Sequence, residues 1–171
     1  MSTLSVDTIQ GKTTAGTVAM PEGAMLQVVQ NHVTGYSTTS SSSMASTGLT
    51  VTITPKFSSS KVLITGNING AYSNAATRYA KYELFKGGSF LVYLHALVGY
   101  NHANAQINYD VDWSFSYLDS PNTTSATTYK LQAHTPYSAT YIIGINTSPT
   151  NDNYSYMTNC VSSITVMEVA A

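Results

Sequence analysis

Asp110 to Tyr117 reads DVDWSFSY, and this stretch decides the fold class. Its apolar residues, Val111, Trp113, Phe115 and Tyr117, alternate strictly with Asp and Ser. A period of two places one set of side chains against a core and the other set in water, which is typical of a β-strand with one wet face. The stretch therefore predicts one strand of an antiparallel sheet.

The same alternation returns on both sides of this stretch. Apolar residues occupy every second position in three further runs, which are residues 49–53, 62–68 and 129–133. Gly87 and Gly88 separate two more strand-like runs and predict a hairpin, because glycine tolerates the positive φ that primed turns require. Eight or nine strands are expected in total. The predicted fold class is all-β, an antiparallel β-sandwich or jelly-roll-like domain.

Four segments fit this pattern less simply. Residues 90–98 (FLVYLHALV) and 141–145 (YIIGI) are apolar on both faces, so we expect a second sheet or another subunit to cover them. The low-complexity residues 37–46 (STTSSSSMAS) predict a loop. Residues 75–85 contain good helix formers, which leaves a short helix there as an alternative.

The chain divides into an arm and a body. Residues 1–24 predict an extended N-terminal arm, and residues 25–171 predict the sandwich head domain. Leu4, Val6 and Ile9 are the only sizeable apolar side chains of the arm before Val18, which is too little to form a core. The arm is therefore either a disordered tail or a docking segment that those three residues anchor. Met1 to Met20 lacks the apolar region of a secretory signal peptide.

Composition narrows the class of function. The 171 residues suit one domain. Charged residues make up 9% and the formal net charge is −1, which argues against binding nucleic acid through a basic patch. No run is long and apolar enough to span a bilayer as a helix, so we expect no membrane insertion. A single cysteine, Cys160, excludes an internal disulfide and a Cys-based zinc site.

The sequence contains no motif typical of an enzyme. The nucleophile elbow, the phosphate loop and the zinc-protease helix motif are all missing, and the histidines are scattered. His95 lies in an apolar run and is expected to be a core residue. Asp110 and Asp112 share one face of a strand, and Asp119 lies in a predicted turn beyond it. We interpret these carboxylates as a solvated face, and we expect no catalytic residue, no metal site and no cofactor.

Tyrosine is the dominant aromatic residue, with 13 copies among 18 aromatic residues. Tyrosine offers a large rigid contact area with a polar tip, which suits surfaces that bind glycans or proteins. Four tyrosines lie among Asn and Ser in predicted loops and are candidate surface-contact residues: Tyr72, Tyr100, Tyr154 and Tyr156. The alternative is that they pack beneath the loops or line a subunit interface.

At the level of whole segments, the chain resembles fibre-type virion proteins of tailed bacteriophages, particularly those that infect cyanobacteria and other marine bacteria. The resemblance lies in the arm (LSVDTIQGKTTAGTV, residues 4–18), in LQVVQ (26–30) and in several segments of the body. These segments are GLTVTITPK (48–56), SSKVL (59–63), LDSP (118–121), TSATTYK (124–130) and SSITVMEV (162–169).

This resemblance implies a non-enzymatic, β-structured protein of the virion that acts as a homotrimer. We expect a short fibre or fibre head whose arm binds other virion proteins and whose loops contact a glycan or protein of the host surface. A capsid decoration protein, with an arm that clamps capsid subunits, is the alternative within the virion. A free carbohydrate-binding module is the alternative from another class, since it would explain the tyrosines but not the arm.

Overall fold

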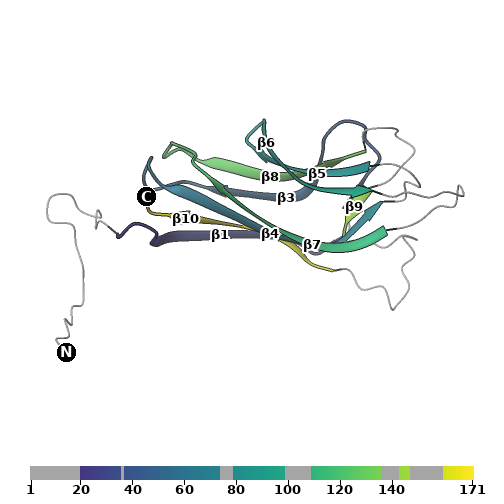
Figure 1. Ribbon diagram of the computed structural model, residues 1–171, viewed down its shortest axis with the longest axis horizontal. Coiled ribbons are helices and arrows are strands. Elements are labelled where there is room, and N and C mark those ends of the chain that lie inside the picture. The colour runs from purple at the N-terminus through teal and green to yellow at the C-terminus, as the bar shows by residue number, and fades with distance from the viewer. Residues whose placement is uncertain (1–19, 36, 74–78, 99–108, 136–142, 147–159) are drawn as a thin grey trace, which may run out of the picture.

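The computed structural model describes residues 20–35, 37–73, 79–98, 109–135, 143–146 and 160–171. All regular structure in these residues is β-strand (Figure 1). The ten strands are β1 (Met25–Val33), β2 (Ser37–Thr39), β3 (Ala45–Ile53), β4 (Lys61–Ser73), β5 (Tyr79–Lys86), β6 (Ser89–Val98), β7 (Tyr109–Asp119), β8 (Thr127–His134), β9 (Ile143–Ile145) and β10 (Ser162–Val169).

The strands form two antiparallel sheets that pack face to face (Figure 1). Four long strands build sheet A in the order β1-β10-β4-β7, and four build sheet B in the order β3-β8-β5-β6. The short strands β9 and β2 extend sheet A at one end, where β9 pairs with the last residues of β4. The eight long strands have the order of a jelly roll, in which the chain repeatedly crosses between the sheets. The predicted sandwich is thereby confirmed.

The period-two runs place their apolar sides in the space between the sheets. Trp113, Phe115 and Tyr117 pack against this core, while Asp112 and Ser114 on the other face of β7 are exposed. The fully or nearly fully buried apolar residues come from both sheets: Leu49, Val51, Ile53, Val62, Ile64, Ile68, Tyr82, Leu84, Tyr129, Leu131, Ala133, Ile145, Ile164 and Val166. Burial of these side chains is the main favourable term for the fold.

One side of the sandwich is closed by hydrogen bonds between the sheets. The side-chain amide of Asn31 in β1 donates to the carbonyl oxygen of Thr50 in β3, at 2.7 Å. The amide of Gln27 donates to the carbonyl oxygen of Thr54, also at 2.7 Å, and to the carboxylate of Glu168. At the opposite side, β6 and β7 are the edge strands, and large aromatic side chains fill the space between them.

The structure corrects three expectations. Residues 79–86 form strand β5, so a helix over residues 75–85 is wrong for the part that is described. Ser37–Thr39 forms β2, and β3 begins at Ala45, so the predicted loop 37–46 is shorter than expected. Asp119 is the last residue of β7 and is buried rather than part of an exposed turn. In each case a partner strand overrides the local preference of the sequence.

The entry of the arm is fixed by backbone hydrogen bonds to the last strand. The amide of Gly23 donates to the carbonyl of Ala170 at 2.8 Å, and the amide of Ala170 donates to the carbonyl of Ala24 at 2.9 Å. Gly23 has a φ of +83°, a conformation that favours glycine. Leu4, Val6 and Ile9 lie outside the described residues, so their docking role stays a prediction.

Candidate functional site

One end of the sandwich lies opposite Met25, where β1 begins (Figure 1). Strands β4 and β6 end there, and β5 and β7 begin there. Ser73, the last residue of β4, pairs with Tyr109, the first residue of β7. Tyr79, which begins β5, pairs with Val98, which ends β6. The segments 74–78, 99–108, 136–142 and 147–159 therefore connect to the body at this end, which we call the loop end. Three of them are rich in Asn, Ser, Thr and Tyr.

The structure locates one of the four predicted contact tyrosines. Tyr72 lies in β4 at the loop end, where its backbone pairs with Asp110 on one side and Gly144 on the other. Tyr100, Tyr154 and Tyr156 lie outside the described residues. Their assembly with Tyr72 into one contact surface stays a prediction.

A buried asparagine joins the strands beneath the loop end. Asn146 has a left-handed backbone with a φ of +53°, which asparagine tolerates better than most residues. Its side-chain amide donates to the carbonyls of Val33 and Gly35, at 2.7 and 3.1 Å, and its side-chain oxygen accepts from Ser162, at 2.6 Å. Its backbone amide donates to the carbonyl of Asn69. Asn146 thus couples β1, β4 and β10 at the base of the loop segments.

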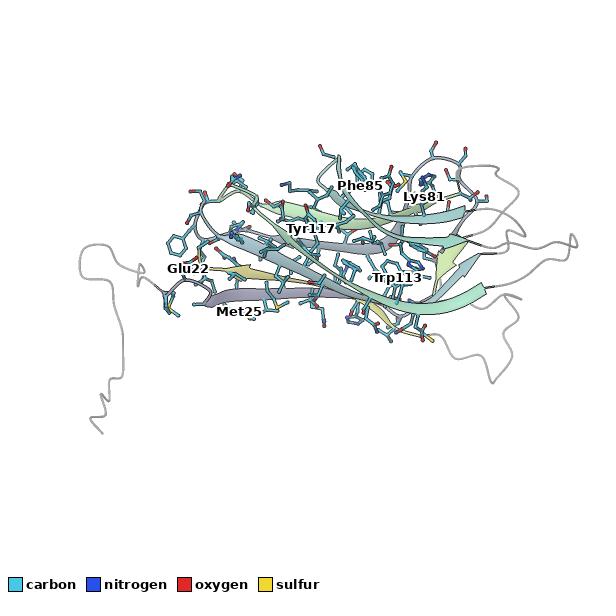
Figure 2. All side chains as sticks on the ribbon, in the orientation of Figure 1. Glu22, Met25, Lys81, Phe85, Trp113 and Tyr117 are labelled. Atoms are coloured by element: carbon cyan, nitrogen blue, oxygen red, sulfur yellow. The ribbon has the colours of Figure 1, made fainter. Side chains whose placement is uncertain are left out.

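Aromatic rings fill the open side of the sandwich between β6 and β7. The His95 ring stacks on the indole of Trp113, with centroids 4.9 Å apart and planes 19° apart, and Tyr82 contacts the same indole at 5.3 Å. Figure 2 shows Trp113 and Tyr117 between the two layers of strands. Burial lowers the pKa of His95, which favours its neutral form. His95 is half-buried at this opening, which is more exposed than the core position expected from the sequence.

An open cavity lies beside this aromatic group. It has a volume of about 310 Å³, and Lys81, Tyr93, Leu94 and His95 line it. The Lys81 ammonium lies 5.2 Å from the centre of the Tyr93 ring, which is a favourable cation–π distance.

Two phenylalanines extend this surface. The Phe90 ring lies 4.7 Å from Tyr93 and 6.1 Å from Phe85. In Figure 2, Lys81 and Phe85 project from the surface of sheet B. We call Phe85, Phe90, Tyr93 and Lys81 the aromatic cluster. Its ring faces and ammonium group suit contact with a sugar ring or a protein side chain.

Of the three carboxylates considered from the sequence, the two that the structure describes have separate partners. The exposed Asp112 accepts a hydrogen bond from the backbone amide of Gly70, at 2.8 Å. Asp119 is buried and accepts hydrogen bonds from Lys86, at 3.0 and 3.1 Å, and from the hydroxyl of Tyr129, at 2.7 Å. Burial, with Asp119 as a further cause, raises the pKa of Tyr129. The side chain of Asp110 lies outside the described part of the structure.

Glu168 is a further buried carboxylate that the sequence indicates only weakly. Glu168 in β10 is fully buried, and it accepts hydrogen bonds from Gln27 at 2.5 Å and from the backbone amides of Lys56 and Phe57 at 2.7 and 3.3 Å. Burial acts to raise the pKa of Glu168, but these hydrogen bonds outweigh it and lower the pKa. The signal in the sequence is the one charge within the apolar run 164–169. Its role is to join β1, β10 and the β3–β4 connection.

Within the described ranges, no group of three or more His, Cys, Asp or Glu side chains could hold a metal ion. In the same ranges, no helix has the length and apolar character that a transmembrane span requires. No protein-family model matches the chain, and no curated protein matches it either. The candidate surfaces that the structure describes are the arm entry, the loop end and the aromatic cluster.

Proposed function

We propose that the protein is a non-enzymatic structural component of a phage particle, a short trimeric fibre or fibre head. Its N-terminal arm binds another virion protein, and its loop end contacts a glycan or protein on the host surface. The action is adhesion, and no bond is made or broken.

The observation that carries this proposal is the polarity of the domain. The arm enters the sandwich at Met25, beside Ala170 at the end of the chain. Strands β4, β6, β8 and β9 end at the opposite end of the sandwich (Figure 1). A two-sheet body whose arm entry and loop end lie at opposite ends suits an adhesin, because anchoring at one end leaves the other end available for contact.

The fold class and the sequence resemblance add support of different kinds. Jelly rolls occur in viral capsid proteins and in lectins, so the fold is compatible with particle and glycan roles without choosing between them. The resemblance to fibre-type virion proteins covers the arm as well as the body, and it favours placement in the virion.

The capsid decoration protein remains the second candidate, because the same polarity would serve it. In that case the arm would clamp capsid subunits and the loop end would face the medium. The two candidates differ only in which virion protein binds the arm.

The free carbohydrate-binding module rests on the aromatic cluster. Tyr93 is 63% exposed and Phe90 is 47% exposed, which is unusual for large apolar side chains. A glycan array with the purified protein addresses this candidate. Retained sugar binding that a Tyr93→Ala substitution abolishes would support it.

Labelling of intact phage particles with an antibody against this chain tests the main proposal directly. Gold label at the tail fibres supports the fibre assignment, and label over the capsid supports the decoration protein. Particles that carry no label at all, although the protein is present in the infected cell, would contradict both virion assignments.

A further inference from the structure

The outward face of sheet A carries an apolar row that crosses all four long strands. In the register of the sheet, Val28 lies opposite Met167, Met167 lies opposite Leu63, and Leu63 lies opposite Leu118. Val28 is 53% exposed and Leu118 is 51% exposed, while Met167 and Leu63 between them are half-buried. We call these four residues the cross-strand row.

The alternation of each strand shows that the row points away from the core. Val29, Val166 and Ile64, its neighbours in sequence, pack within or against the core. Within the described residues, no strand covers the outward face of sheet A, since sheet B packs on its other side. The row is therefore an apolar surface in water, built from residues that lie far apart in the sequence.

The rest of this face is polar but carries no formal charge. The next row towards the loop end is Gln30, Thr165, Thr65 and Ser116, and the one beyond it is His32, Ser163, Asn67 and Ser114. Gln30 donates a hydrogen bond to Thr165 at 2.8 Å, within the first of these rows. None of these residues is Asp, Glu, Lys or Arg. Charged residues enter the face only beyond its two ends, at Lys61 and Asp112.

Sheet B presents a different outward face. Lys81 and Lys130 alternate there with the core residues Tyr82 and Tyr129, and the buried Glu83 lies on the same side. The exposed rings of the aromatic cluster share this face. The chain thus places charges on one sheet and excludes them from the middle of the other. That asymmetry is unexpected for a monomer, in which both outward faces meet the same solvent.

We propose that the outward face of sheet A binds a second copy of this chain, with the cross-strand row as the apolar edge of the contact on the arm side. A two-fold contact places a patch against its own copy, and a three-fold assembly brings copies of a patch together where that patch faces the axis, so a face used in either way must avoid like charges. This face meets that condition, and the apolar row supplies burial. With strands about 4.8 Å apart and about 3.4 Å per residue, the three rows cover roughly 20 by 20 Å, a substantial share of what one partner contributes to a standard interface.

The position of the row adds a functional consequence, which rests on the proposed trimeric fibre. The row lies at the arm end of sheet A, three residues after β1 begins and two residues before β10 ends. Copies that meet there hold their arms close together and leave their loop ends free. Several arms on one assembly bind a particle together and gain effective concentration.

The test introduces charge into the row without disturbing the core. Leu118→Lys and Val28→Lys replace half-exposed residues at the two edges of the face, so the isolated domain should fold. Thr52→Lys on the outward face of sheet B is the matched control, because Thr52 is an exposed strand residue that lies outside the aromatic cluster. Sedimentation equilibrium of the full chain gives the mass, and circular dichroism with thermal melting checks the fold of each variant.

We expect the parent chain and Thr52→Lys to be oligomers of equal mass. In Leu118→Lys and Val28→Lys, like charges meet across the contact, and the association should weaken by about tenfold or more. The parent association should change little between low and high salt, since no charged pair holds it. A parent oligomer that both row variants leave intact would overturn the proposal, and so would a parent monomer at micromolar concentration.

The outcomes separate this proposal from the proposed function. A parent dimer that the row variants dissociate supports the face and contradicts the trimer. A parent trimer that the row variants dissociate, from a chain that is absent from phage particles, supports the face and contradicts the virion role. Gold label on particles together with row variants that keep the parent mass supports the virion role and overturns the face.

Discussion

The ring of Phe115 lies over the α-carbon of Gly66, its register partner across β4 and β7. A β-carbon built on Gly66 would lie 2.3 Å from Cε1 and 2.6 Å from Cζ of that ring, closer than real contacts allow. Glycine is needed here for space rather than for an unusual backbone, because Gly66 lies within a regular strand. The aromatic ring takes the volume that a side chain would otherwise occupy between the sheets.

Gly66→Ala should therefore destabilise the protein by about 1–3 kcal/mol, because the core must shift to admit the methyl group. Urea unfolding monitored by tryptophan fluorescence measures this change. Adding Phe115→Leu should recover part of the loss, since a smaller side chain frees the space and the two positions are coupled. Gly88→Ala is the control, with nothing within 4 Å of its added carbon and an expected change near zero. Equal losses at both glycines would contradict the steric account.

Removal of the Tyr129 hydroxyl tests the buried polar group around Asp119. Tyr129→Phe should cost about 1–3 kcal/mol, because Asp119 loses one charge-assisted hydrogen bond and keeps Lys86. The same substitution at the exposed Tyr93 should change the free energy of unfolding by less than about 0.5 kcal/mol. Chemical denaturation of the two variants gives the comparison. A Tyr129→Phe variant as stable as the parent would show that the phenol contributes no net stability.

Glu168 gives the fold a defined response to acid. Its pKa is lowered in the folded protein, so the unfolded state binds the proton more tightly. The stability that Glu168 contributes is present above its ordinary pKa of 4.5 and is lost as the pH falls through the lower folded value. Glu168→Gln should lose about 2 kcal/mol at neutral pH and should show a weaker loss of stability in acid than the parent.

Thermal melting between pH 7 and pH 3 measures this difference, with Glu22→Gln as the exposed control. The parent and the control should lose stability in parallel, whereas the Glu168→Gln curve should be flatter. Three parallel curves would place the acid sensitivity in other groups.

The sequence predicted where the strands lie better than it predicted how they pair and where they end. The alternation around Trp113 and the paired glycines at the β5–β6 hairpin are local signals, and the structure confirms both. Strand β3 begins at Ala45, within the hydrophilic residues 37–46. Pairing with β8 overrides the loop-like composition of these residues. Local patterns indicate where a strand lies, but hydrogen bonding between distant segments decides where it ends.

Local patterns in the sequence do not show which distant residues meet in the cross-strand row or around Glu168. Leu118 breaks the polar side of its strand, which is a visible signal. Its alignment with Val28, 90 positions earlier in the sequence, requires three strand pairings. Glu168 is a charge in an apolar run, but its partners Gln27 and Lys56 come from remote segments. Contacts of this range arise from topology, and period-two patterns leave register undetermined.

The last prediction concerns truncation of the N-terminal arm, because this change tests binding to the virion separately from folding of the body. A chain that begins at Ala24 loses two hydrogen bonds, from Gly23 to Ala170 and from Ala24 to Pro21, and keeps the one from Ala170 to Ala24. Each lost bond costs about 0.5–1.5 kcal/mol, so the truncated protein should melt slightly below the parent. A chain that begins at Met20 keeps all three bonds and serves as the control for folding. Neither should enter phage particles, since both lack Leu4, Val6 and Ile9.

Full burial of each of those three side chains contributes roughly 1.5–3 kcal/mol to the free energy of docking. The loss of conformational entropy opposes docking by about 1–2 kcal/mol for every residue that becomes ordered. One arm alone is therefore a weak anchor, and added strand pairing with a partner and joint binding of several arms make it workable. Quantitative immunoblotting of purified particles measures incorporation. If either truncated chain reached the copy number of the parent on particles, the body rather than the arm would be the anchor.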